Sequence, residues 1–156
     1  MLWFFEWCEA TWLGTAVRGS VGAFPMIESI HLLGLSLLGG AILIVDLRML
    51  GVGLTHQRIA ALARDARPWL LAALGTMVLS GVPLFLSEAV KCYHNPSFRV
   101  NMTALPIALA YTFLVREPVA RSVTLDTSWR SRLVAVGSIA VWFTVAAAGR
   151  WIGFSS

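Results

Sequence analysis

The chain has 156 residues, of which 58% are hydrophobic and 13% are charged, and its formal net charge is +4. Soluble domains carry about a quarter charged residues, so this composition excludes an ordinary water-soluble fold. The sequence has no basic patch with interleaved aromatic residues, which excludes nucleic acid as the partner of the positive charge. The composition predicts an integral membrane protein whose main partner is the lipid bilayer.

Residues 1–18 predict an amphipathic helix that lies in the outer membrane interface. On a helix, Glu6 and Glu9 point away from a face made of Trp3, Phe4, Trp7, Cys8 and Trp12. Tryptophan is favoured at the boundary between lipid and water. A loosely attached aromatic tail is the alternative. The two glutamates interrupt the apolar run and no basic residue precedes it, so we do not expect a cleaved secretory signal.

Four apolar segments follow, each near the ~20 residues that a helix needs to cross a bilayer. We expect spans at about 25–47, 68–91, 98–115 and 132–154. Asn95-Pro96 breaks the chain between the second and third spans, and Pro83 and Pro106 predict kinks. Residues 55–66 are amphipathic and are expected along the inner leaflet. The predicted fold is all-α, a transmembrane four-helix bundle that forms a single domain over residues 1–156.

The basic residues predict the orientation of these spans. Eight arginines fall in the connections between the first two and the last two spans: Arg48, Arg58, Arg64, Arg67, Arg116, Arg121, Arg130 and Arg132. The other side has four basic residues, Arg18, Lys91, Arg99 and Arg150. By the positive-inside rule, we expect both connections in the cytoplasm and both termini in the periplasm, across a bacterial inner membrane.

Polar side chains recur near the outer end of every predicted span. Glu28 and His31 share one face of the first helix, with His31 ~9 Å below Pro25. The other three spans contribute Glu88, Asn101 with Met102, and Arg150. Ionisable groups at this depth are costly and normally face a bundle interior, so we expect a functional site here. The alternative is a set of interfacial ion pairs, with His31 bonded to a neighbouring carbonyl.

Three sequence elements resemble a family of bacterial four-helix membrane proteins of unknown function. They are Met26-Ile-Glu-Ser-Ile-His31-Leu-Leu-Gly34, Val45-Asp46-Leu47-Arg48 and Gly149-Arg150-Trp151-Ile152. Members of that family often have lysine where this chain has Asn101. More distantly, a histidine near the outer end of the first helix looks like the haem-binding membrane protoporphyrinogen oxidases and small b-type cytochromes.

These residues lead to the hypothesis of one haem b, with His31 as an axial ligand through a neutral imidazole nitrogen. Arg150 would pair with a propionate, Glu28 would orient His31 or exchange protons, and Gly34 would leave a groove for the macrocycle. Glu88 and Asn101 belong to the same expected site. The second metal ligand is not determined by the sequence. The candidates are His94, Met102 and Met26, or the position has no protein ligand. The sequence has no Cys-x-x-Cys-His, the motif for covalent c-type attachment, and His56 is expected to be solvated.

Three functions are compatible with these residues. The first is a redox protein that passes electrons between quinone and a periplasmic or membrane partner, or oxidises a small substrate. The second is a metal or small-molecule carrier that resembles copper-resistance membrane proteins, with His31, Met26 and Met102 as soft ligands. The third is a non-catalytic accessory subunit. A homo-oligomer stays open, as does the state of Cys8 and Cys92, which are expected on the oxidising side as a disulfide or as two free thiols.

Overall fold

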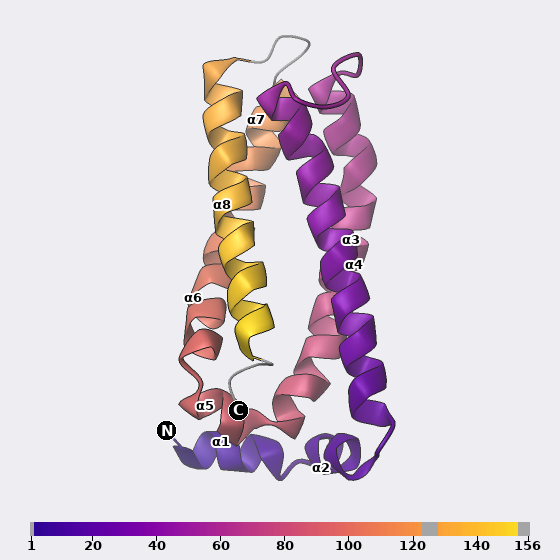
Figure 1. Cartoon of the computed structure of the whole chain (residues 1–156), viewed down its shortest axis with the longest axis vertical. Coiled ribbons are helices and arrows are strands. Elements are labelled where there is room, and N and C mark those ends of the chain that lie inside the picture. The colour runs from indigo at the N-terminus through magenta and orange to yellow at the C-terminus, as the bar shows by residue number, and fades with distance from the viewer. Residues whose placement is uncertain (1, 123–127, 153–156) are drawn as a thin grey trace.

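The computed structural model describes residues 2–122 and 128–152, and this described part consists of helices and short connections without a strand. Four long helices run side by side (Figure 1): α3 (Ala23–Leu50), α4 (Ile59–Ser87), the helix Pro96–Ser122 and α8 (Trp129–Ile152). The shortest has 24 residues, and the hydropathy of each is at least 1.4. Each can therefore cross ~30 Å of hydrocarbon. The prediction of an all-α, four-helix membrane fold is confirmed.

The third long helix contains a wide turn. It consists of α6 (Pro96–Tyr111), the π-helical segment η1 (Thr112–Arg116) and α7 (Glu117–Ser122). In η1 the amide of Glu117 bonds to the carbonyl of Thr112, five residues earlier. Pro118 follows at once, and a proline inside a helix has no N–H to donate and clashes with the carbonyl four residues before it. The wider turn relieves that clash and shifts the register of the side chains around it.

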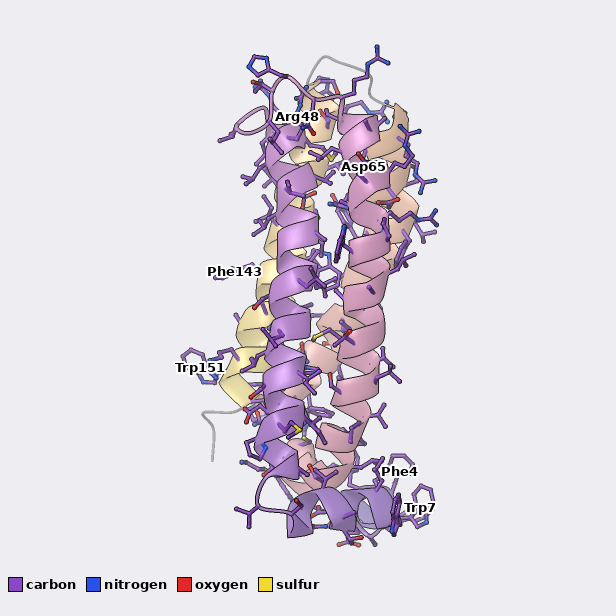
Figure 2. All side chains as sticks on the ribbon, turned by 90° about the vertical axis from the view of Figure 1, so that its right-hand side faces the viewer. Phe4, Trp7, Arg48, Asp65, Phe143 and Trp151 are labelled. Carbon is purple, nitrogen blue, oxygen red and sulfur yellow. The ribbon has the colours of Figure 1, made fainter. Side chains whose placement is uncertain are left out.

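Two short helices, α1 (Leu2–Glu9) and α2 (Trp12–Gly19), lie across one end of the bundle (Figure 1). The predicted helix of residues 1–18 is therefore broken in two, and Thr11 caps α2 by accepting a hydrogen bond from the amide of Gly14. Phe4 and Trp7 point away from the bundle (Figure 2) and are exposed. We call α1 and α2 together the lid, and the end of the bundle that they cover the lid end. The opposite end, where the chain passes from α3 to α4, is called the hairpin end.

The predicted inner-leaflet segment at residues 55–66 is wrong, because most of it is the beginning of α4. Ile59 and Leu62 are buried in one cluster with Val45 and Met49 of α3. The apolar side of this segment thus packs against a neighbouring helix instead of lipid.

The main core lies between the four long helices. Large side chains, such as Ile42, Leu70 and Trp142, alternate there with alanines that let the helices approach closely. At most 33% of the most apolar stretch of any span is buried inside the protein. The remaining apolar surface faces outward, as in helices surrounded by lipid. Polar side chains are therefore unusual in the interior. They occur in two regions, one near each end of the bundle.

Candidate functional site

His31 lies on α3, ~12 Å along the helix from its first residue. Its Nδ1 is 2.8 Å from the hydroxyl oxygen of Ser80 on α4. The Ser80 hydroxyl donates its single hydrogen to the carbonyl of Thr76 at 2.6 Å, so the proton between Ser80 and His31 belongs to Nδ1. The neutral ring then presents an unprotonated Nε2. The imidazole is held in a tautomer that suits a metal ligand.

Glycine lets the imidazole approach α4. A Cβ atom on Gly81 would lie 3.2 Å from the Cε1 atom of His31. The groove expected beside Gly34 is filled instead, since a Cβ atom there would lie 3.1 Å from the methyl group of Thr76 and 3.4 Å from the sulfur of Met77. Gly34 is therefore a packing residue between α3 and α4, and Gly81 is the glycine against the ring.

Glu28 is one turn nearer the lid end than His31 on α3. Both residues are half-buried, and the Glu28 carboxylate acts on the imidazole electrostatically. The predicted pairing on one helix face therefore holds, and Glu28 is the acidic residue of that face that is placed to influence His31.

Asn101 of α6 contributes a buried polar atom nearer the lid end than the hairpin end. Its side-chain amide faces Gly149 of α8, where a Cβ atom would be 3.9 Å from both amide heavy atoms. Its Oδ1 is buried and has no hydrogen-bond partner among the described residues. A buried acceptor without a donor is unfavourable, and a ligand or a water molecule would satisfy it. The next residue on α8, Arg150, has an exposed side chain.

The other predicted site residues lie on the surface of the lid end. Glu88 pairs with Lys91 at 3.5 Å, and both side chains are more than 40% exposed. His94 is exposed and packs edge-on against the Tyr93 ring, with 5.0 Å between the ring centroids. Met26 and Met102 are 67% and 45% exposed. The described residues contain no group of three His, Cys, Asp or Glu that could hold a metal ion.

The lid is fastened to α5 (Ala89–His94), the short helix between α4 and α6. The carboxylate of Glu9 pairs with Arg18 and accepts a hydrogen bond from the amide of Val90 at 2.9 Å. The ring of Phe5 packs against Phe85 and Tyr93. These contacts fix α1 and α2 over the bundle.

Cys8 of the lid helix α1 and Cys92 of α5 are both buried, and both are free thiols. Burial, followed by the negative charge of Glu88, raises the pKa of the Cys92 thiol to about 11. Since the thiolate is the reactive form, Cys92 is a poor nucleophile at neutral pH.

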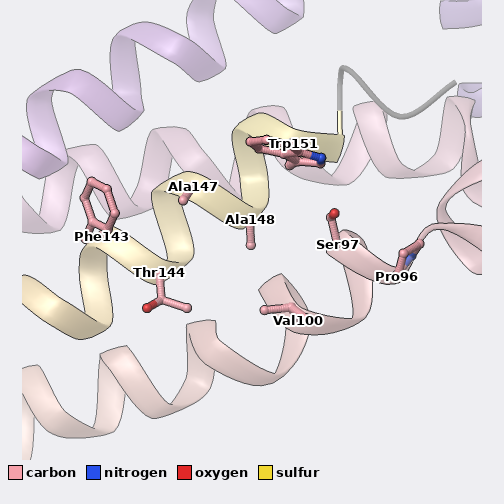
Figure 3. Close-up of a pocket in the computed structure, with 8 residues that line it drawn as sticks. All are labelled: Pro96, Ser97, Val100, Phe143, Thr144, Ala147, Ala148 and Trp151. Carbon is pink, nitrogen blue, oxygen red and sulfur yellow. The ribbon is translucent and has the colours of Figure 1, made fainter.

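A groove of about 480 Å³ runs between α6 and α8 near the lid end (Figure 3). Thr144 and Ala148 of α8 face Val100 and Ser97 of α6 across it, and Trp151 lies at its lid-end edge. The remaining lining residues are Pro96, Phe143 and Ala147. Its walls are mainly apolar, so the groove suits a hydrocarbon-like occupant.

The hairpin end contains a buried network of ion pairs that the sequence pattern does not predict. The Nε of Arg116 is 2.6 Å from Oδ1 of Asp46, and its Nη2 donates to the carbonyl of Ile42 at 2.9 Å. The same guanidinium is 3.7 Å from Glu117, which in turn bonds to Arg121 at 2.9 Å. The side chains of Asp46 and Arg116 are 0% and 1% exposed. This network of ion pairs joins α3 to the third long helix.

Two neutral contacts support the same region. The indole N–H of Trp142 on α8 donates to the hydroxyl of Thr112 at 2.9 Å, and both residues are buried. The hydroxyl of Tyr111 donates to the carbonyl of Val134 at 3.1 Å. The π-helical segment therefore presents Thr112 and Arg116 to the interior. The available sequence signals were Asp46, an acidic residue directly after an apolar run, and Pro118, which disturbs the helix.

One protein family matches residues 4–155, almost the whole chain, and its description is "Family of unknown function (DUF6644)". No curated protein and no solved structure matches the chain.

Proposed function

The chain belongs to this family of unknown function, and from its own residues we propose that it is a membrane redox protein that binds one haem b near the lid end. The observation that carries this proposal is the hydrogen bond from His31 to Ser80, which leaves Nε2 of His31 unprotonated. Metal-bound histidines commonly donate their other ring N–H to a fixed acceptor, which orients the ring.

One histidine near the lid end, His31, would hold the haem iron. The two ring nitrogens of an imidazole point in nearly opposite directions, so Nε2 of His31 is turned away from Ser80 on α4. Arg150 would pair with a propionate, and the unpartnered Oδ1 of Asn101 would accept a hydrogen bond from a water molecule beside the bound group. Haem b would supply one-electron chemistry when bound.

Electron exchange with a quinone in the bilayer is the second part of the proposal. The apolar groove between α6 and α8 supports it, since its volume of about 480 Å³ lies within the range of small-molecule sites. The other electron partner would be a periplasmic or membrane protein. The arginines at the hairpin end support a cytoplasmic position for that end, with the lid in the periplasm of a bacterial inner membrane.

An absorption spectrum of the protein, purified in detergent from cells supplied with haem precursor, tests the cofactor. We expect a Soret band in the wild type and its loss in His31→Ala. The matched control is His56→Ala, because His56 is exposed in the α3–α4 connection. A wild-type protein without haem, or a His31→Ala variant with the full haem content, would overturn the proposal.

The orientation is tested separately with reporter fusions. A reporter joined after Ser156 should be active as a periplasmic fusion, and one inserted after Gly53, between α3 and α4, should behave as cytoplasmic. The reverse pattern would contradict the proposed topology without bearing on haem.

A further inference from the structure

Two arginines near the hairpin end have exposed side chains on one face of α4. Arg64 and Arg67 are three positions apart, so they are neighbours on the surface of that helix. Neither forms an ion pair with another described residue. Asp65 lies between them in the sequence, but it is ~100° round the helix from Arg64 and therefore on another face. This face of α4 thus carries two positive charges that no described side chain neutralises.

The neighbouring helix α7 brings a third guanidinium group to the same end. Ala120 of α7 and Ala63 of α4 are buried in one cluster, and Arg121 and Arg64 directly follow these two alanines. Arg121 is paired with Glu117 at 2.9 Å, yet its side chain is 50% exposed. Both helices of this contact therefore carry exposed arginines beside it.

The exposed indole of Trp69 indicates the depth of these arginines in the membrane. Tryptophan is favoured at the boundary between lipid and water, and Trp69 of α4 is 60% exposed. Along the helix, Arg67 lies ~3 Å and Arg64 ~8 Å further from the bilayer centre than Trp69. The two guanidinium groups are therefore at the level of the lipid phosphates of the adjacent leaflet.

The same face of α4 is apolar further into the membrane. Leu71, Val78 and Val82 continue it at helical spacing and are 47%, 63% and 50% exposed. A Cβ atom on Gly75, which lies between them, would meet nothing within 4 Å. The helix thus presents positive charge at the membrane surface and an open apolar strip beneath it, which matches an anionic headgroup and its acyl chains.

We propose that Arg64 and Arg67 of α4, together with Arg121 of α7, form a binding site for an anionic phospholipid such as phosphatidylglycerol. Its acyl chains lie along the exposed apolar strip of α4. Arginine binds phosphate oxygens through parallel N–H donors, and the headgroup of phosphatidylglycerol has no positive charge of its own to compete. The site is independent of the haem proposal, because its three arginines lie at the other end of the bundle from His31.

Native mass spectrometry of the full-length protein in detergent, titrated with phosphatidylglycerol or with phosphatidylcholine, tests this proposal. We expect the wild type to bind phosphatidylglycerol more tightly. In the double variant Arg64→Gln with Arg67→Gln, this affinity should fall by about 5-fold for each arginine removed, which corresponds to about 1 kcal/mol each. The affinity for zwitterionic phosphatidylcholine should change much less. Glycerol phosphate has the charge without the acyl chains, and effective competition by it would contradict the lipid assignment.

The matched control is Arg130→Gln with Arg132→Gln, which removes the same charge from exposed arginines of α8 at the same end. This control should keep the preference for phosphatidylglycerol. A wild type without the preference, or a double variant of Arg64 and Arg67 that retains it in full, would overturn the proposal. An equal loss in the control would overturn it as well, because the attraction would then come from the total charge of this end and not from a site on α4.

Discussion

The polar residues at the two ends of the bundle are buried to very different degrees. At the lid end the side chains of Glu88 and Lys91 are 42% and 44% exposed, whereas Asp46 and Arg116 at the hairpin end are 0% and 1% exposed. A charge that reaches water needs no fixed partner, but a buried charge does, because the interior does not solvate it. The hairpin end is therefore tied to one geometry, whereas the exposed charges at the lid end are solvated by water.

Breaking the buried pair tests this contrast most directly and should have the largest effect. In Asp46→Ala, Arg116 keeps only the more distant Glu117, and we expect the free energy of unfolding to fall by about 3–5 kcal/mol. Reversible unfolding in mixed micelles measures the change. The double variant Asp46→Leu with Arg116→Met removes both charges and should recover most of this loss. If the double variant were as unstable as the single one, the unpaired charge would not be the cause.

A smaller effect is expected from the acceptor of His31 at the lid end. Ser80→Ala removes the group that fixes the imidazole tautomer, and the affinity for haem should fall by about 10- to 100-fold. Haem titration of the apoprotein, followed by absorption, gives the dissociation constant. Ser80→Thr keeps a hydroxyl and should bind normally. Ser87→Ala is the matched control, because Ser87 is also a buried serine of α4, bonded to the Leu84 carbonyl. An equal loss in that control would argue against a specific role for Ser80.

Close packing at the hairpin end provides the next test. A Cβ atom on Gly137 would collide with the hydroxyl of Tyr111, so Gly137→Ala should lower the free energy of unfolding by about 1–3 kcal/mol. Adding Tyr111→Phe removes the hydroxyl and should restore part of this loss. A Cβ atom on Gly75 meets nothing within 4 Å, so Gly75→Ala should be neutral or stabilising by up to about 1 kcal/mol. Both changes are measured by the same micelle unfolding, and equal destabilisation would contradict the assigned contact.

The smallest effect should come from the exposed ion pair at the lid end. Glu88→Gln should change the free energy of unfolding by less than about 1 kcal/mol, because water and salt screen both groups. The difference from wild type should shrink further as the salt concentration rises. A loss comparable to that of Asp46→Ala would erase the contrast between the two ends.

The membrane fold could be predicted because it depends on long apolar stretches, which are visible in the sequence itself. The predicted ends of the helices are less accurate where packing against a neighbouring helix determines them. Residues 59–66 form the first turns of α4 because Ile59 and Leu62 find partners on α3, and a sequence pattern does not distinguish a helix face that meets lipid from one that meets protein.

The candidate site could be predicted only as far as single helices allow. The spacing of Glu28 and His31 places them on one face, but Ser80 and Gly81 meet His31 only through the register between α3 and α4. The same limit explains Gly34, whose expected groove is filled by side chains of α4. The sequence indicates only the role of Arg116 in orientation, because a regular helix gives no sign that the π-helical segment presents this residue to Asp46.

The contact between Glu9 and Val90 has a consequence for the order in which the protein assembles. The two residues are 81 positions apart, so Glu9 is synthesised long before the amide that it binds. The contact between α1 and α5 cannot form until α3 and α4 have been made and α5 has left the ribosome. Until then the tryptophans of α1 can hold this helix at the membrane surface. Helix α1 is therefore made before α3, α4 and α5 but completes its native contacts only after them, and a nascent chain stopped before Val90 would lack the Glu9–Val90 hydrogen bond.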